Sequence, residues 1–111
     1  MKNFRKTILR VDLNAIVHNF NAIKKRAGEG VRIAPVLKAD AYGLGVKEVM
    51  QALPGLESVC VASVEEGIAL RRLHGEIEII ILSGLCRPAL KAIEKNRLTP
   101  VVFEPTIIPF L

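Results

Sequence analysis

The sequence has 111 residues, of which 50% are hydrophobic and 24% charged, a composition that fits one globular domain and excludes a disordered chain. Its 16 Lys and Arg against 11 Asp and Glu give a formal net charge of +5, but the two signs are interleaved along the chain, which is typical of a solvated surface. With 5% aromatic residues and no Trp, the chain has no stacking platform for bases, so we expect no nucleic-acid partner.

Neither a targeting signal nor a membrane span is predicted. The basic N-terminus is followed by Arg10 and Asp12 rather than by an apolar run, and the most apolar stretch, 77–86, is too short to cross a bilayer. We therefore expect a cytoplasmic protein without a membrane partner.

Cys60 and Cys86 lack the spacing and the neighbouring histidines of a zinc site, so no metal is expected. Cys60 lies in an apolar run and is expected to be a reduced, buried thiol.

Short β-branched runs alternate with amphipathic helical patterns, which predicts an α/β protein with a parallel sheet and crossover helices. The expected strands are residues 7–13, 31–38, 58–62, 78–83 and 98–103. The first expected helix is capped by Asn14 and ended by Gly28 and Gly30, and the second runs over 46–53. A third opens at Ser63, with Glu66 completing a capping box, and a fourth starts at Arg87 or Pro88. Pro35 and Pro100 fall inside two of the strands, and because proline cannot donate to a ladder we expect irregular pairing there.

The chain ends on an apolar tail, residues 107–111, just where another helix should begin after 104–106. Four or five parallel strands form only an open sheet, which leaves such a tail uncovered. We therefore interpret the sequence as part of a larger domain.

Lys38 ends an apolar strand and begins a turn of small residues, 39–45. In parallel α/β folds, ligand-binding and catalytic groups lie at the carboxyl ends of strands. We expect the amine of a lysine there to be desolvated, which favours the neutral form that attacks an aldehyde. Tyr42 is placed to set its phenol beside a bound anion, and Gly43 and Gly45 allow close approach of the backbone. The alternative is a structural lysine whose amine simply reaches water.

Residues 34–45, with the sequence APVLKADAYGLG, resemble the pyridoxal-phosphate lysine motif of the alanine racemase family. Residues 11–16 with Asn19 are similar to the entry segment of that family, and 63–67 and 82–84 are similar to parts further along. The resemblance therefore covers nearly the whole chain.

The resemblance implies that residues 1–111 are the N-terminal portion of a pyridoxal-phosphate-binding (β/α)8 TIM-type barrel, α/β in class and too short to close. The remaining barrel and a mainly β second domain are expected elsewhere. The implied activity is the racemisation of L-alanine and D-alanine, which supplies D-alanine for cell-wall peptidoglycan, by a full-length homodimer with alanine as its small-molecule substrate. Residues 1–111 alone are expected to associate and to be inactive.

The resemblance also implies roles for single residues. Lys38 binds pyridoxal 5'-phosphate covalently and is one of two acid/base groups, Tyr42 hydrogen-bonds the cofactor phosphate, and Val36 packs against the cofactor ring. In the family the second acid/base group is a tyrosine from the second domain of a partner subunit. Leu44 stands where the family commonly has His, so one local hydrogen bond of the turn is expected to be lost.

Two other functions stay open at this point. One is a non-catalytic barrel protein that holds pyridoxal phosphate, and the other is a non-catalytic α/β binding module in which Lys38 is structural.

Arg87 either reaches an anionic group or starts a helix. The remaining ionisable candidates are expected to be solvated surface groups: His18, His74, Glu65, Glu66, Arg71 and Arg72.

Overall fold

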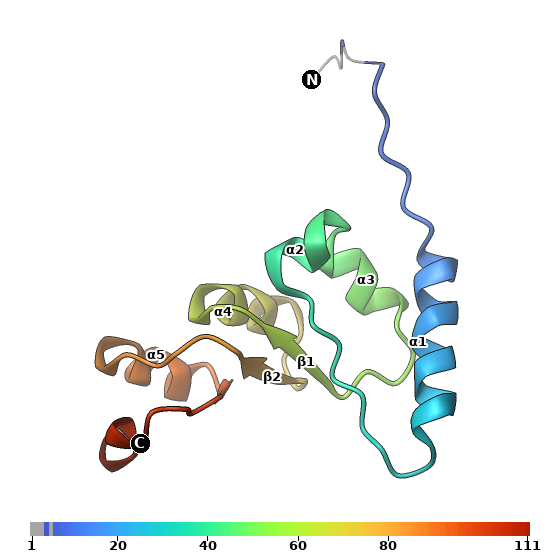
Figure 1. The fold of residues 1–111 in the computed structure, drawn as a ribbon. Coiled ribbons are helices and arrows are strands. Elements are labelled where there is room, and N and C mark those ends of the chain that lie inside the picture. Colours follow the sequence, from blue (N-terminus) through green and yellow to red (C-terminus); the bar gives the residue numbers. More distant parts are fainter. Residues whose placement is uncertain (1–3, 5) are drawn as a thin grey trace.

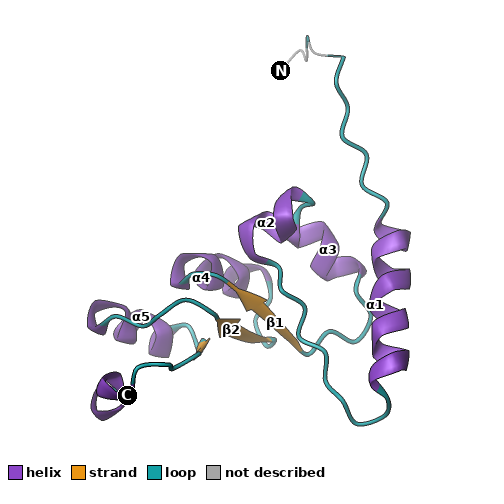
Figure 2. Ribbon diagram, viewed as in Figure 1, coloured by secondary structure: helices purple, strands orange, loops and turns teal. Residues whose placement is uncertain are grey.

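The computed structural model describes Phe4 and residues 6–111, and it has the expected α/β architecture (Figures 1 and 2). Its extents are 52 × 43 × 23 Å and its radius of gyration is 16.4 Å, against about 13 Å for a compact domain of roughly 100 residues. Figure 1 shows two reasons for this larger radius: residues 6–12 are extended, and the helices are spread in a row beside a small sheet.

The expected strand at 7–13 is wrong. Residues 6–12 have no regular structure, and Ile8 and Leu9 are 83% and 76% exposed. The alternating pattern fits a strand, but a strand also needs a neighbouring edge that satisfies its N–H and C=O groups. Residues 6–12 lead away from the sheet and meet no such edge (Figure 1).

Helix α1 (Leu13–Ala27) is capped by Asp12, and the predicted cap at Asn14 is wrong. Oδ1 of Asp12 accepts hydrogen bonds from the backbone N–H groups of Asn14 at 3.0 Å and Ala15 at 3.2 Å. A carboxylate at this position satisfies otherwise unpaired amides and favours the positive end of the helix dipole. The helix ends at Gly28, as predicted.

Among the described residues, three parallel strands form the sheet, in the order β1 (Ser58–Val61), β2 (Glu78–Ile81) and β3 (Thr99–Pro100). They fall within three of the predicted strands. β3 is short because Pro100 has no N–H to continue the ladder, which ends with the N–H of Val101 donating to the carbonyl of Ile81 at 2.9 Å.

The expected strand at 31–38 is reduced to a single bridge, in which Val36 pairs in parallel with Cys60. The N–H of Cys60 donates to the carbonyl of Pro35 at 2.9 Å, and the N–H of Leu37 donates to the carbonyl of Cys60 at 2.8 Å. The segment therefore lies beside β1 as a strand would. Pro35 cannot donate, which accounts for the irregularity that the sequence predicts.

Helical segments connect and follow the strands. They are α2 (Lys38–Gly43), α3 (Val46–Ala52), α4 (Val64–Leu73), the 3-10 helix η1 (Arg87–Ala89), α5 (Leu90–Lys95) and the 3-10 helix η2 (Pro105–Phe110). α3, α4 and the η1–α5 segment match the predicted helices, and η2 stands where a further helix is expected.

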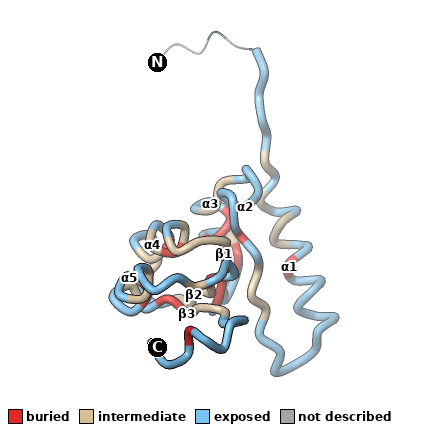
Figure 3. Tube along the Cα trace, turned by 60° about the vertical axis from the view of Figure 1, so that its left-hand side comes forward, coloured by how far each residue is buried: buried red, intermediate tan, exposed pale blue. Residues whose placement is uncertain are grey.

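The core lies between the helices and one face of the sheet. Val59, Val61, Ile79 and Ile81 are 0–1% exposed, and the register pairs Val59 with Ile79 and Val61 with Ile81, so all four point to the same face. Figure 3 shows the buried residues gathered along the strands. Burying each such side chain contributes about 1.5–3 kcal/mol.

The sheet stays open. Apolar side chains beside and beyond the strands remain exposed, with Val36 and Leu82 each at 38% and Phe103 at 62%. Parallel sheets in α/β proteins are normally covered on both faces. The predicted α/β class with a parallel sheet that does not close is therefore confirmed.

Candidate functional site

The turn that follows Lys38 is a left-handed helical turn. Ala39, Asp40, Ala41 and Tyr42 all have positive φ, between 51° and 56°, with ψ between 35° and 50°. An L-residue in a left-handed helix costs roughly 1–2 kcal/mol because its Cβ crowds the following carbonyl oxygen. Four such residues in succession persist only where the surrounding structure holds them.

Backbone bonds and packing hold the turn from inside. The N–H of Ala41 donates to the carbonyl of Leu37, and the N–H of Gly45 donates to the carbonyl of Asp40, both at 3.0 Å. Ala41 and Leu37 are buried in the core, so the inner side of the turn is packed. Gly43 and Gly45 supply φ of 83° and 91°, which glycine adopts without steric cost.

Two carboxylates hold the ends of the turn. Oδ1 of Asp40 accepts a hydrogen bond from the N–H of Val46, the first residue of α3, at 2.8 Å. Oε1 of Glu66 accepts from the N–H of Ala39, and Oε2 accepts from the N–H of Ala62, both at 2.8 Å. Hydrogen bonds with an ionised acceptor are roughly twice as strong as neutral ones. Glu66 therefore ties the start of the turn firmly to α4.

The capping box predicted from Ser63 and Glu66 is present in a modified form. Oγ of Ser63 accepts from the N–H of Glu66 at 3.2 Å and caps α4. In the usual box the glutamate returns to the N–H of the cap residue itself. Here it reaches Ala62, one residue earlier, and its other oxygen serves Ala39. The backbone N–H of Glu65 and the Ser63 hydroxyl lower the pKa of the neighbouring Glu65 carboxyl.

The predicted site residues Val36, Lys38 and Tyr42 lie at this end of the sheet, and all three are exposed. The buried Leu37 lies between the exposed Val36 and Lys38 in sequence, and one helical turn separates Lys38 from Tyr42. The expectation of a desolvated amine at Lys38 is wrong for this structure. Its physical reason is the open sheet, whose carboxyl end no further element covers among the described residues.

The chemistry of these side chains fits a ligand that has an aldehyde, a ring and an anionic group. Lys38 offers a primary amine, Tyr42 a hydroxyl donor and Val36 an apolar surface. Because all three are exposed, such a ligand has access to them.

The other candidates have structural roles. Cys60 is buried and free, as predicted, and burial together with the charge of Glu78 raises the pKa of its thiol. Arg87 begins η1, and its guanidinium carbon lies 3.5 Å from the centre of the Phe110 ring, so the helix-start role is the one observed.

Within Phe4 and 6–111, no group of three or more His, Cys, Asp or Glu could hold a metal. In the same residues no helix has the length and apolar character to span a bilayer.

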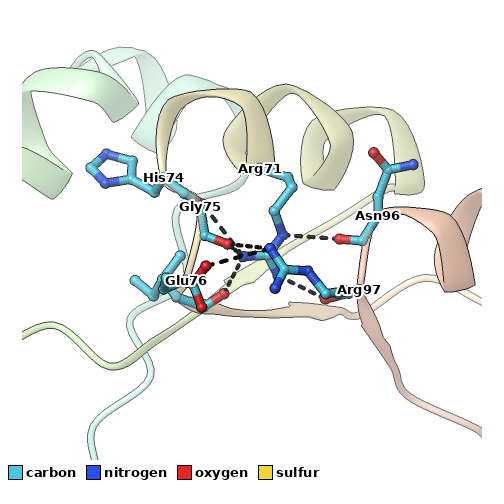
Figure 4. A network of polar contacts seen from close by, with 7 residues as sticks. Arg71, His74, Gly75, Glu76, Asn96 and Arg97 are labelled. Atoms are coloured by element: carbon cyan, nitrogen blue, oxygen red, sulfur yellow. Dashed lines mark hydrogen bonds and ion pairs between the residues drawn. The ribbon is translucent and has the colours of Figure 1, made fainter.

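Arg71 is not a solvated charge, contrary to the prediction. From α4 it donates to five backbone carbonyls (Figure 4): Asn96 at 2.9 Å, His74 at 3.4 Å, Gly75 at 3.0 Å, Ile77 at 2.6 Å and Arg97 at 2.7 Å. These carbonyls precede β2 and β3. Arg71 therefore joins the amino ends of two strands to the end of α4.

Glu66 is likewise not a solvated charge, because it also holds the turn after Lys38. The separations explain why: Glu66 and Ala39 are 27 residues apart, and Arg71 and Arg97 are 26 apart. The available local signals were the Ser63–Glu66 spacing and the position of Arg71 next to the buried Leu70. Neither signal predicts which distant residue the side chain binds.

Comparison with known proteins gives the family. The family model described as alanine racemase, N-terminal domain, matches residues 11–108. The chain belongs to this family. Its match confirms the resemblance predicted from residues 34–45.

Among curated relatives, the alanine racemase of Aquifex pyrophilus is 39% identical over 104 residues, which is 91% of this chain and 30% of that protein. Among solved structures, alanine racemase from E. faecalis superposes with a TM-score of 0.76 at 30% identity, over 81% of this chain and 25% of that one. The alanine racemase from Bartonella henselae with covalently bound pyridoxal phosphate gives 0.74 at 28% identity, over 81% and 26%.

The chain thus spans less than a third of the length of the relatives it matches. Its three-stranded parallel sheet corresponds to part of the barrel domain of alanine racemases, and the predicted fold class, a partial (β/α)8 barrel that does not close, is confirmed.

Proposed function

We propose that residues 1–111 are the N-terminal portion of the barrel domain of an alanine racemase, and that they carry the lysine that binds pyridoxal 5'-phosphate. The observation that supports this most is the left-handed turn that begins at Lys38, at the carboxyl end of a strand-like segment, in a chain of this family. The covalently bound pyridoxal phosphate of the Bartonella henselae enzyme supports the choice of cofactor.

In this proposal three residues hold the cofactor. The amine of Lys38 binds its aldehyde and later moves the substrate α-proton on one face, the phenol of Tyr42 donates a hydrogen bond to its phosphate, and Val36 packs against its ring. Once bound, pyridoxal phosphate supplies the electron sink that stabilises the deprotonated α-carbon. Tyr42 is the only tyrosine of the sequence, so the acid/base group on the opposite face must come from another residue or from a partner subunit.

The wider setting is part of the same proposal. The full-length protein acts on alanine as a homodimer, and its product D-alanine is destined for peptidoglycan. The two free thiols, Cys60 and Cys86, support a reducing, cytoplasmic location.

We further propose that residues 1–111 alone have no measurable racemase activity. The sheet has open edges and exposed apolar side chains such as Val36 and Phe103, which favour association between chains. Size-exclusion chromatography and an activity assay of the 111-residue polypeptide test this, and an active, monodisperse monomer would contradict it.

The test of the activity uses the complete gene product that contains these residues. Loaded with pyridoxal phosphate, it should abolish the optical rotation of L-alanine. Lys38→Ala should lower the rate by about a thousandfold or more. The matched control is Lys47→Ala, on the exposed surface of α3, which should keep the rate. A folded, cofactor-loaded protein that leaves the optical rotation unchanged would contradict the proposal and favour a non-catalytic pyridoxal-phosphate protein.

A further inference from the structure

Glu66 bridges the turn after Lys38 and the segment that leads into α4, at the carboxyl end of the sheet. Its two carboxylate oxygens accept from the N–H of Ala39, in the turn, and from the N–H of Ala62, just before α4, each at 2.8 Å. Its own N–H donates to Oγ of Ser63 at 3.2 Å, which fixes the backbone of Glu66 at the start of the helix. One carboxylate oxygen is therefore bound to the segment before α4, and the other is bound to the turn.

The N–H of Ala39 belongs to the peptide group that joins Lys38 to Ala39. A hydrogen bond to this group restrains rotation about the Cα–C bond of Lys38. On the preceding side, the N–H of Leu37 is bound to the carbonyl of Cys60 at 2.8 Å. Lys38 thus stands between two restrained points, and Glu66 provides the only one of them that a side chain makes.

Ala39 is also the first residue with a strained backbone, at φ 51° and ψ 50°. An alanine released from its hydrogen bond relaxes toward negative φ, because the left-handed region is unfavourable for a residue with a Cβ. That relaxation would redirect the chain at Lys38 and would move Tyr42, which depends on the same turn.

We propose that Glu66 is a positioning residue for Lys38: its carboxylate holds the first peptide of the left-handed turn and so sets the direction in which the lysine side chain leaves the strand. The inference rests on the proposed function, because it assigns to Glu66 the orientation of the amine that binds pyridoxal phosphate. A carboxylate suits the task, since it accepts from both amides at once while a carboxamide has one acceptor oxygen.

The first experiment compares Glu66→Ala and Glu66→Gln with Glu65→Ala, the matched control on the same helical turn, in the complete gene product. Hydrogen exchange followed by mass spectrometry reports the amides of Ala39 and Ala62. Borohydride reduction after incubation with pyridoxal phosphate, followed by peptide mapping, measures the fraction of Lys38 that carries the cofactor at subsaturating concentration.

Glu66→Ala should speed exchange at Ala39 about tenfold and lower the apparent affinity for trapping at Lys38 by about the same factor, because it removes a charge-assisted hydrogen bond. Glu66→Gln should lie between wild type and Glu66→Ala, and Glu65→Ala should match wild type. Equal trapping in Glu66→Ala and Glu65→Ala would overturn the inference.

A second variant separates positioning of Lys38 from mere capping of α4. Glycine has no Cβ to clash at φ 51°, so Ala39→Gly should restore trapping when it is combined with Glu66→Ala. A double variant that traps as little as Glu66→Ala would overturn the inference, because the loss would then come from α4. If the wild-type protein itself gives no product at Lys38, the proposed function fails, and exchange at Ala39 still decides whether Glu66 holds the turn.

Discussion

The two ends of α4 carry charged side chains that organise the backbone in opposite ways. Near its N-terminus, the anion of Glu66 accepts from backbone amides of the turn and of the segment before the helix. Near its C-terminus, the cation of Arg71 donates to carbonyls of the connections that lead into β2 and β3. One helix thus gathers donors at one end of the sheet and acceptors at the other.

The difference lies in what each charge holds. Arg71 holds connecting segments at the amino ends of the strands, which in α/β barrels serve stability. Glu66 holds a strained turn at the carboxyl ends, where barrel enzymes carry their active sites. Loss of Arg71 should therefore cost mainly folding free energy, whereas loss of Glu66 should cost mainly the geometry of Lys38.

The largest expected effect on stability is at Arg71. Arg71→Met keeps much of the side-chain volume but leaves the carbonyls without their donor, so we expect a loss of about 3 kcal/mol in the free energy of unfolding. Urea unfolding followed by circular dichroism measures it in the complete gene product.

Two further variants sharpen this result. Arg71→Lys should recover only part of the loss, because an ammonium lacks the planar set of five donors. Arg72→Met, at the exposed neighbour, is the control and should stay within about 0.5 kcal/mol of wild type. Equal destabilisation by Arg71→Met and Arg72→Met would remove the contrast between the two ends of α4.

The cap of α4 should have the next largest effect. Ser63→Ala removes the oxygen that accepts from the N–H of Glu66, and loss of such a cap costs about 1 kcal/mol. Thermal unfolding measures the change. Because Ser63 fixes the backbone of Glu66, hydrogen exchange at Ala39 should also rise slightly; a cap that acts on α4 alone would leave Ala39 unchanged.

Removing the steric strain of the left-handed turn should raise the free energy of unfolding slightly. Ala39→Gly removes a steric cost of roughly 1–2 kcal/mol but adds the backbone entropy cost of glycine, roughly 0.5–1 kcal/mol, so we expect net stabilisation by about 0.5 kcal/mol. Ala41→Gly meets the same backbone conformation but also loses a buried methyl, so it should be neutral or destabilising. Destabilisation by Ala39→Gly would contradict the strain assigned to Ala39.

The smallest effect concerns pH. The pKa of Glu65 is lowered from 4.5 by its own backbone N–H and by Ser63. Its carboxylate therefore stabilises the fold fully above pH 4.5 and loses this contribution as pH falls through the lowered value. The stability difference between wild type and Glu65→Gln should shrink in that acid range, and Ser63→Ala should move the transition toward higher pH. A difference that does not vary with pH would rule out this linkage.

The periodic elements were predictable because their signals are local. The apolar spacing in 46–53 predicts α3, and the β-branched runs at 58–62 and 78–83 predict β1 and β2. The strand expected at 7–13 fails because alternation describes a strand's faces and not the neighbouring edge that it requires.

Features that depend on contacts between residues far apart in the chain could not be predicted from the sequence. Within 39–42, only Asp40 is of a residue type that visits the left-handed region. The packing of Ala41 in the core and the hydrogen bond from Ala39 to Glu66 stabilise the turn through residues that are distant in sequence. The five carbonyls on Arg71 likewise come together only once β2 and β3 lie side by side.

The most direct test of the central claim, that the left-handed turn presents Lys38 to pyridoxal phosphate, is peptide mapping of the complete gene product after incubation with the cofactor and borohydride reduction. The account predicts one reduced adduct, on Lys38. Label spread over exposed lysines such as Lys47 and Lys91, with none enriched at Lys38, would contradict it.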